Sequence, residues 1–216
     1  MIKAVLFDMD GTVLDTENMY REAWRGAFER TEHEFSEELF NKCIGLPISV
    51  MEKLVNDSYG VSGVFEETFQ TAAAIATKHK KTHGVPIKAG FYELSDFLKE
   101  RGIKSVVATS TEHDTAVKDL TESGIISRFI GVIGGDDVKN GKPAPDPYVR
   151  AAELAGVPTE NCIAIEDSVN GIRSAAAAGV RCVYIKDVVD IPPEIEELVF
   201  KKANSLDEVI GIIDNM

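Results

Sequence analysis

Two kinds of hydrophobic pattern divide the chain. Residues 2–7 form a short continuous apolar run that ends in Asp8-Met9-Asp10-Gly11, which is typical of a buried strand followed by a turn. From about residue 15 to residue 84 the apolar positions instead repeat with a helical period, and β-branched runs are almost absent. This segment predicts helices over 16–30, 37–42, 50–58 and 65–83, separated by breaks that contain glycine at 45–47 and 60–63.

After Pro86, short apolar strands alternate with helices, several of which end at a glycine. The pattern predicts helices over 91–101, 112–123, 146–155, 169–178 and 206–213, and strands over 104–108, 129–133, 162–165 and 182–185. This alternation is typical of a parallel sheet with helices on both faces. We therefore expect an α/β fold: a Rossmann-like doubly wound core made of residues 1–15 and 87–216, with an all-helical cap inserted at 16–86.

Length and composition fit this division. The chain has 216 residues, about 1.4 domains at roughly 150 residues per domain. No apolar run approaches the ~18 residues that a membrane span needs, and two aspartates interrupt the N-terminal segment where a signal peptide would be apolar. Three cysteines without a CxxC spacing indicate reduced thiols. We expect a cytoplasmic protein with no membrane partner.

The charge balance excludes another class of partner. The chain has 23 basic and 36 acidic residues and a formal net charge of −13, which repels a phosphate backbone. We therefore expect no binding to nucleic acid. Nothing in the pattern demands a second subunit, so the expectation is a monomer.

The predicted sheet gathers its polar side chains at one edge. Ligands of open parallel sheets bind beyond the carboxyl ends of the strands. The residues that follow three of the strands, and the loop before the helix at 146–155, carry carboxylates, hydroxyls and one lysine: Asp8, Asp10, Thr109, Ser110, Thr111, Lys142, Glu166 and Asp167. Each group taken singly is also typical of a turn, a helix N-terminus or a solvated loop.

Together these residues favour phosphate chemistry. Carboxylates that face one another repel unless a cation lies among them, and Mg²⁺ prefers a few carboxylates together with a substrate phosphate. Hydroxyls and amides at the start of a helix can hold an anion. No histidine or cysteine is predicted nearby as a nucleophile, so an aspartate must attack and form an aspartyl-phosphate.

The segments FDMDGTVLDTE, VVATST, KPAPDP and IEDSVNGI resemble the four motifs of the haloacid dehalogenase superfamily, in the subgroup with a helical cap after the first strand. The resemblance covers nearly the whole chain. It implies that Asp8 is the nucleophile and a Mg²⁺ ligand, and that Asp10 is the general acid and base and binds the metal through its carbonyl. It further implies that Thr109 and Ser110 hold the phosphoryl group and that Lys142 neutralises its charge. Asp167 would be a metal ligand, and Glu166 either a further ligand or a residue that contacts a ligand.

Departures from the family pattern narrow the activity. Dehalogenases of the superfamily lack the second aspartate, whereas Asp10 is present here. The β-phosphoglucomutases carry a histidine at the place where this chain has Tyr20, and an arginine at about the place where it has Ile48. The phosphonoacetaldehyde hydrolases need a lysine in the cap, and the first cap helix of this chain contains none. The prediction is a phosphatase that hydrolyses a small phosphorylated metabolite, a sugar or nucleoside-like phosphate monoester.

Two other functions stay open at this point. A phosphomutase would return the phosphoryl group to a sugar, and a binding protein would keep the fold without turnover. Cap residues are expected to select the substrate, namely Glu17, Tyr20 and the loop at 45–46. His79 and His83 are four residues apart on a predicted helix, and we interpret them as part of its exposed surface and not as a metal site. Asp136 and Asp137 are candidates to line the phosphate site.

Overall fold

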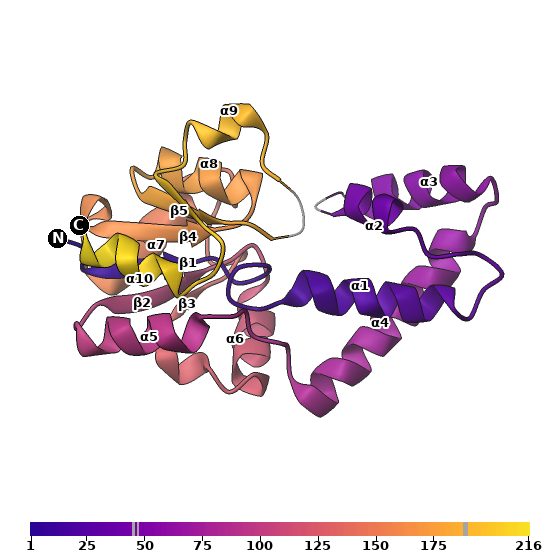
Figure 1. Cartoon of the computed structure of the whole chain (residues 1–216), viewed down its shortest axis with the longest axis horizontal. Helices are drawn as coiled ribbons and strands as arrows, with labels where there is room; N and C mark the ends of the chain where they lie inside the picture. Colours follow the sequence, from indigo (N-terminus) through magenta and orange to yellow (C-terminus); the bar gives the residue numbers. More distant parts are fainter. Residues whose placement is uncertain (45, 47, 188–189) are drawn as a thin grey trace. The chain divides into compact units, whose positions relative to one another are not determined.

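The computed structural model describes residues 1–44, 46, 48–187 and 190–216. It divides into two compact units, a core unit of Met1–Asp15 with Val85–Met216 and a helical unit of Thr16–Gly84 (Figure 1). The second boundary lies two residues before the one that the sequence suggests. Val85 is tied to the core unit because its N–H donates to Ser123 Oγ at 3.1 Å, and the Ser123 hydroxyl donates back to the Val85 carbonyl at 3.0 Å.

The core unit is built on one parallel sheet of six strands in the order β3-β2-β1-β4-β5-β6. Its strands are β1 (Ala4–Phe7), β2 (Lys104–Ala108), β3 (Val132–Ile133), β4 (Cys162–Glu166), β5 (Arg181–Ile185) and β6 (Lys201–Ala203). All four residues of β1 are buried, which explains its unbroken apolar run. β1 lies between β2 and β4, where the strand order reverses, and ligands of doubly wound sheets bind at such a point.

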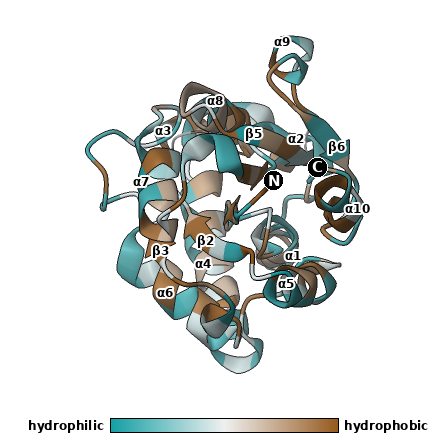
Figure 2. Cartoon of the chain, turned by 90° about the vertical axis from the view of Figure 1, so that its left-hand side faces the viewer, coloured by the Kyte–Doolittle hydropathy of each residue, from teal (hydrophilic) through white to brown (hydrophobic). Residues whose placement is uncertain are grey.

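Helices cover both faces of this sheet. α7 (Asp146–Ala155) and α8 (Val169–Ala177) pack together on one face, and α5 (Phe91–Glu100) packs with α10 (Glu208–Asp214) on the other. Alternate residues of β1 point to opposite faces. Leu6 joins the buried cluster of α7 and α8, whereas the Phe7 ring meets Phe91 and Phe129 edge-on. In Figure 2 brown, the colour of hydrophobic residues, appears on the strands in the middle of the core unit, including β2.

The predicted α/β fold class is confirmed, with differences at the edges of the sheet. β6 is not predicted, because it exposes two lysines and buries Ala203 alone. The short helix α9 (Pro193–Glu196) is not predicted either. β3 is shorter than the predicted 129–133. Phe129 instead turns its ring into the core, and Ile130 is exposed. The helix α6 (His113–Glu122) packs beside β3.

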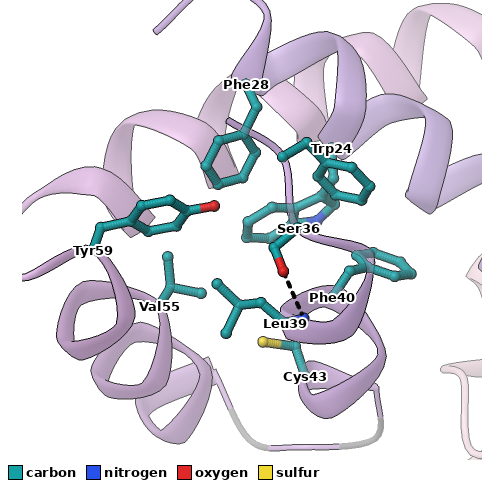
Figure 3. Close-up of a pocket in the computed structure, with 9 residues that line it drawn as sticks. Trp24, Phe28, Ser36, Leu39, Phe40, Cys43, Val55 and Tyr59 are labelled. Carbon is teal, nitrogen blue, oxygen red and sulfur yellow. Dashed lines mark hydrogen bonds between the residues drawn. The ribbon is translucent and has the colours of Figure 1, made fainter. Parts of the chain in front are cut away.

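The helical unit consists of α1 (Thr16–Phe28), α2 (Glu37–Cys43), α3 (Ile48–Tyr59) and α4 (Val64–His83). α1 packs along α4, and the Ser36 hydroxyl caps α2 by accepting the Leu39 N–H at 3.2 Å. Trp24 stacks on Phe28, with ring centroids 6.0 Å apart. Trp24, Phe28 and Val55 line a small, almost wholly apolar cavity (Figure 3). Apolar packing around these rings holds the unit together.

Two further features bear on the sequence expectations. Among the described residues, no helix combines the length and apolarity that crossing a membrane requires. Cys43, Cys162 and Cys182 are buried and unpaired, and burial raises the pKa of the Cys162 thiol to about 11. The cysteines therefore act as small apolar core residues.

Candidate active site

Asp8 lies directly beyond β1, at the point where the strand order reverses. Its N–H donates to the Ile165 carbonyl of β4 at 3.0 Å, so the sheet ladder continues one residue past the strand and fixes the backbone of Asp8. Thr109 occupies the same place beyond β2, where its N–H donates to the Ile133 carbonyl at 3.0 Å. Both side chains are buried. The structure thus brings the two strand ends together at one edge, as the alternating pattern implies.

Lys142 reaches this edge from the loop before α7. Its ammonium lies 2.5 Å from Asp8 Oδ1 and 2.6 Å from Glu166 Oε1, and its side chain is only 3% exposed. Burial opposes the charged form, but Asp8 and Glu166 outweigh burial and hold the pKa of Lys142 above its usual value. The two carboxylates therefore favour the charged form of this buried ammonium.

Glu166 is the most enclosed carboxylate, with none of its side chain exposed. Its Oε1 accepts from Lys142 and from the Tyr148 hydroxyl at 2.7 Å. Its Oε2 accepts from Asp167 N at 3.1 Å and from the N–H and hydroxyl of Ser168 at 3.1 and 3.0 Å. Five donors thus surround one carboxylate, and a cation bound directly to Glu166 would have to replace one of them.

Asp167 is held close to the turn that follows β1. The Thr12 hydroxyl donates to its Oδ1 at 2.8 Å. Gly11 has a φ of +81°, and a Cβ at that position would lie 2.3 Å from Asp167 Oδ2. Only glycine allows both this backbone conformation and this approach.

Asp10 is anchored by Thr111, one of the hydroxyl residues that follow β2. The Thr111 hydroxyl donates to Asp10 Oδ2 at 2.7 Å, and the Thr111 N–H donates to Thr109 Oγ1 at 3.1 Å. The turn after β2 therefore orients the second aspartate of the turn after β1. Ser110 lies exposed between these two threonines.

The electrostatics of the site indicate a missing positive charge. Asp8, Glu166 and Asp167 each offer an oxygen, and these oxygens lie within 4.8 Å of one another. Burial, opposed by Lys142 and reinforced by Glu166, raises the pKa of Asp8 to about 7. Burial and the charges of Asp8 and Glu166 also hold the pKa of Asp167 well above its usual value. The oxygens of the three carboxylates are the ligand type that a hard divalent cation prefers, and the single ammonium of Lys142 does not balance their charge.

The other predicted residues belong to the helical unit and to the loop that follows β3. Glu17 and Tyr20 belong to α1 of the helical unit, Leu46 is partly exposed, and position 45 lies outside the described residues. Asp136 accepts the His113 N–H at 2.7 Å at the start of α6. Asp137 accepts the Gly134 N–H at 2.8 Å and contacts the His113 ring. These two aspartates hold their own loop.

Several residues that build the site have no role assigned from the sequence, among them Thr12 and Gly171, which lie within the quoted motif segments, and Tyr148, which does not. A Cβ on Gly171 would lie 1.7 Å from Glu166 Oε1, so the helix α8 passes directly against that carboxylate. Tyr148 carried no signal beyond its place in the first turns of the helix after Lys142. Such contacts depend on packing between elements, which a periodic pattern does not encode.

The chain matches the model of the haloacid dehalogenase-like hydrolase family over residues 5–185. A phosphorylated carbohydrates phosphatase of Thermotoga maritima is 31% identical over 183 residues, which cover 85% of this chain and 84% of that protein. A HAD family hydrolase of Deinococcus radiodurans R1, solved with bound phosphate and sodium, shares the fold with a TM-score of 0.87 and 20% identity, over 99% of this chain and 96% of that one. A β-phosphoglucomutase of Clostridium difficile has a TM-score of 0.70 and 22% identity, over 100% and 96% of the two chains.

Proposed function

This chain belongs to the haloacid dehalogenase-like hydrolase family, and from that membership we propose that it is a Mg²⁺-dependent phosphatase of small phosphate monoesters. The observation that carries the proposal is the buried contact of Lys142 with Asp8 beside Asp167 and Glu166. This contact supports the proposal because it gathers a carboxylate oxygen, a buried ammonium group and two further carboxylates at one edge of the sheet. The phosphatase of phosphorylated carbohydrates among its relatives supports a phosphorylated sugar as the substrate class.

Asp8 is the nucleophile in this proposal. One of its carboxylate oxygens attacks phosphorus, the bond from phosphorus to the ester oxygen breaks, and an aspartyl-phosphate forms on Asp8. Lys142 stays protonated and lowers the negative charge around the transferring phosphoryl group. Thr109 and Ser110, at the end of β2, supply a hydroxyl and an amide for its oxygens.

Asp10 moves the protons. It gives a proton to the departing ester oxygen, and then takes one from the water that attacks the aspartyl-phosphate, so that free phosphate leaves and Asp8 is restored. The hydrogen bond from Thr111 orients the carboxyl group of Asp10. Glu166 holds Lys142 in place throughout.

Asp8, Asp167, the carbonyl of Asp10 and Glu166 would hold the cation, with Glu166 giving up one of its donors if it binds directly. Mg²⁺ bound there supplies positive charge that keeps Asp8 ionised and stabilises charge on the phosphoryl oxygens. The helical unit, through Glu17 and Tyr20, selects the substrate in this proposal. Tyr20 stands where the mutases of the subgroup carry histidine, which favours hydrolysis over phosphoryl return. We place this monomeric enzyme in the reducing cytoplasm, which suits its three free thiols.

The test is release of inorganic phosphate from a panel of phosphorylated sugars and nucleosides with Mg²⁺. A phosphatase releases one phosphate per substrate consumed, and a mutase converts a sugar phosphate to its isomer without release. Asp8→Asn should abolish release, because an amide cannot attack phosphorus, and mass spectrometry of the wild type should place a trapped phosphoryl group on Asp8. If Asp8→Asn keeps a tenth of the wild-type rate, the covalent mechanism is wrong.

Asp10 is tested by its leaving-group dependence. Asp10→Asn can donate a hydrogen bond but cannot transfer a proton, so kcat should fall by roughly 10²–10⁴ for a sugar phosphate. The burst phase should fall much less for a nitrophenyl phosphate, whose leaving group needs little protonation. Equal loss of the burst for both substrates would remove Asp10 from the acid role.

A further inference from the structure

Asp187 lies two residues beyond β5, at the same carboxyl edge of the sheet as Asp8 and Asp167. Its side chain is only 7% exposed. One oxygen, Oδ1, accepts from the Lys88 ammonium at 2.5 Å. Lys88 also lies 3.4 Å from Asp15 Oδ1, so this lysine faces two carboxylates at once.

The other oxygen of Asp187 has no such partner. Oδ2 is buried, and no donor within the described part of the chain reaches it. It lies 3.0 Å from the point that a Cβ on Gly11 would occupy, and Asp167 Oδ2 lies 2.3 Å from the same point. Two carboxylate oxygens from different elements therefore converge over Gly11, one of them from the candidate cation cluster.

This arrangement is unfavourable without a further group. A buried carboxylate oxygen without a donor loses its hydration, and a second carboxylate oxygen close to it adds repulsion. The single charge of Lys88 is shared with Asp15, so it leaves Asp187 only partly neutralised. A cation with its hydration shell, bound beside Asp167, would supply both the positive charge and the missing donor.

We propose that Asp187 is a fourth acidic residue of the divalent-cation site, whose Oδ2 accepts a hydrogen bond from the water shell of the cation while Oδ1 stays on Lys88. The inference rests on the proposed function for the cation itself. Mg²⁺ keeps several waters when proteins bind it, and groups that hydrogen-bond to its shell change the affinity by about 10- to 100-fold. Asp187 is thus a positioning residue of the cation site.

The experiment is a direct titration of the substrate-free protein with Mn²⁺, in which the electron paramagnetic resonance signal counts the free ion, followed by competition with Mg²⁺. Asp187→Asn should weaken cation binding by about 10- to 100-fold. Lys88→Met removes the same ion pair but keeps the Asp187 charge, and Asp15→Asn removes the other carboxylate on Lys88. Both controls should bind within threefold of the wild type.

A second variant is the control for misfolding. It is needed because Asp187→Asn leaves Lys88 without its nearest counter-charge, which can destabilise the fold by itself. The double variant Lys88→Met/Asp187→Asn removes both charges, and it should bind the cation as weakly as Asp187→Asn. Its fold is checked by circular dichroism. A loss below threefold in the folded double variant overturns the inference, as does a loss in Lys88→Met equal to that in Asp187→Asn. A wild type that binds no cation contradicts the metal of the proposed function instead.

Discussion

Lys142→Met tests the charge balance of the site most directly. The substitution keeps the length of the side chain and removes the cation that lies 2.5 Å from Asp8 and 2.6 Å from Glu166. Breaking a buried ion pair costs about 3–5 kcal/mol, because the remaining charge is left unpaired in the interior. Glu166 keeps four other donors, and Asp8 can take up a proton, so we expect the lower end, about 3 kcal/mol at pH 8.

The readout must come from the core unit. The single tryptophan, Trp24, belongs to the helical unit, so its fluorescence follows the unfolding of that unit. We would follow amide hydrogen exchange of β1 and β4 by mass spectrometry in metal-free protein, where about 3 kcal/mol corresponds to exchange faster by roughly a hundredfold. At pH 5, where Asp8 is already protonated, the loss should be smaller.

Tyr148→Phe sets the scale for this measurement. It removes one neutral donor from the same oxygen of Glu166 and leaves Lys142 in place, so its cost should be about 1–2 kcal/mol. Adding Mg²⁺ should stabilise Lys142→Met more than it stabilises the wild type, because the cation supplies positive charge to the same carboxylates. Exchange in Lys142→Met within threefold of the wild type at pH 8 would refute the reasoning.

Two further predictions follow from the same geometry. Gly171→Ala should destabilise the core unit by about 1–3 kcal/mol and lower kcat, because the new Cβ would displace Glu166. Gly211→Ala is the control: it lies on the helix α10 with open space around it, so the change should stabilise the protein by about 0.5–1 kcal/mol. Urea unfolding measures both, and equal changes in the free energy of unfolding would contradict the clash at Gly171. The folded pKa of Asp8 is raised above its ordinary value to about 7, so the stability of the metal-free protein should fall as pH rises from about 4 toward 7. Between about pH 4 and 7, Mg²⁺ must displace the proton on Asp8 in order to bind. The Kd for Mg²⁺, measured by calorimetry, should therefore fall by up to about tenfold for each unit that the pH rises, and level off above pH 8. A Kd that does not change with pH would contradict the raised pKa of Asp8.

The fold was predictable wherever local pattern and tertiary role coincide. β1, β2, β4 and β5 are apolar runs because they are buried on both faces, and a run of that kind is visible in the chain. β6 was missed because its residues are mostly exposed, and it is a strand only through its pairing with β5. β3 starts later than the pattern predicts, because Phe129 packs against Phe7, a partner more than a hundred residues away.

The candidate site divides in the same way. Asp8, Thr109 and Glu166 were predictable as neighbours, because the end of a strand is a local property and parallel strands bring their carboxyl ends to one edge. The pattern along the chain was therefore enough to predict the fold class, the edge of the sheet where the candidate site lies and the residue types available there. Which of those residues touch depends on how the elements pack. The five donors on Glu166, the hydrogen bond from Thr111 to Asp10 and the approach of Asp187 to Asp167 over Gly11 each depend on the packing of elements far apart in the chain, and packing at that precision is set by all the elements together.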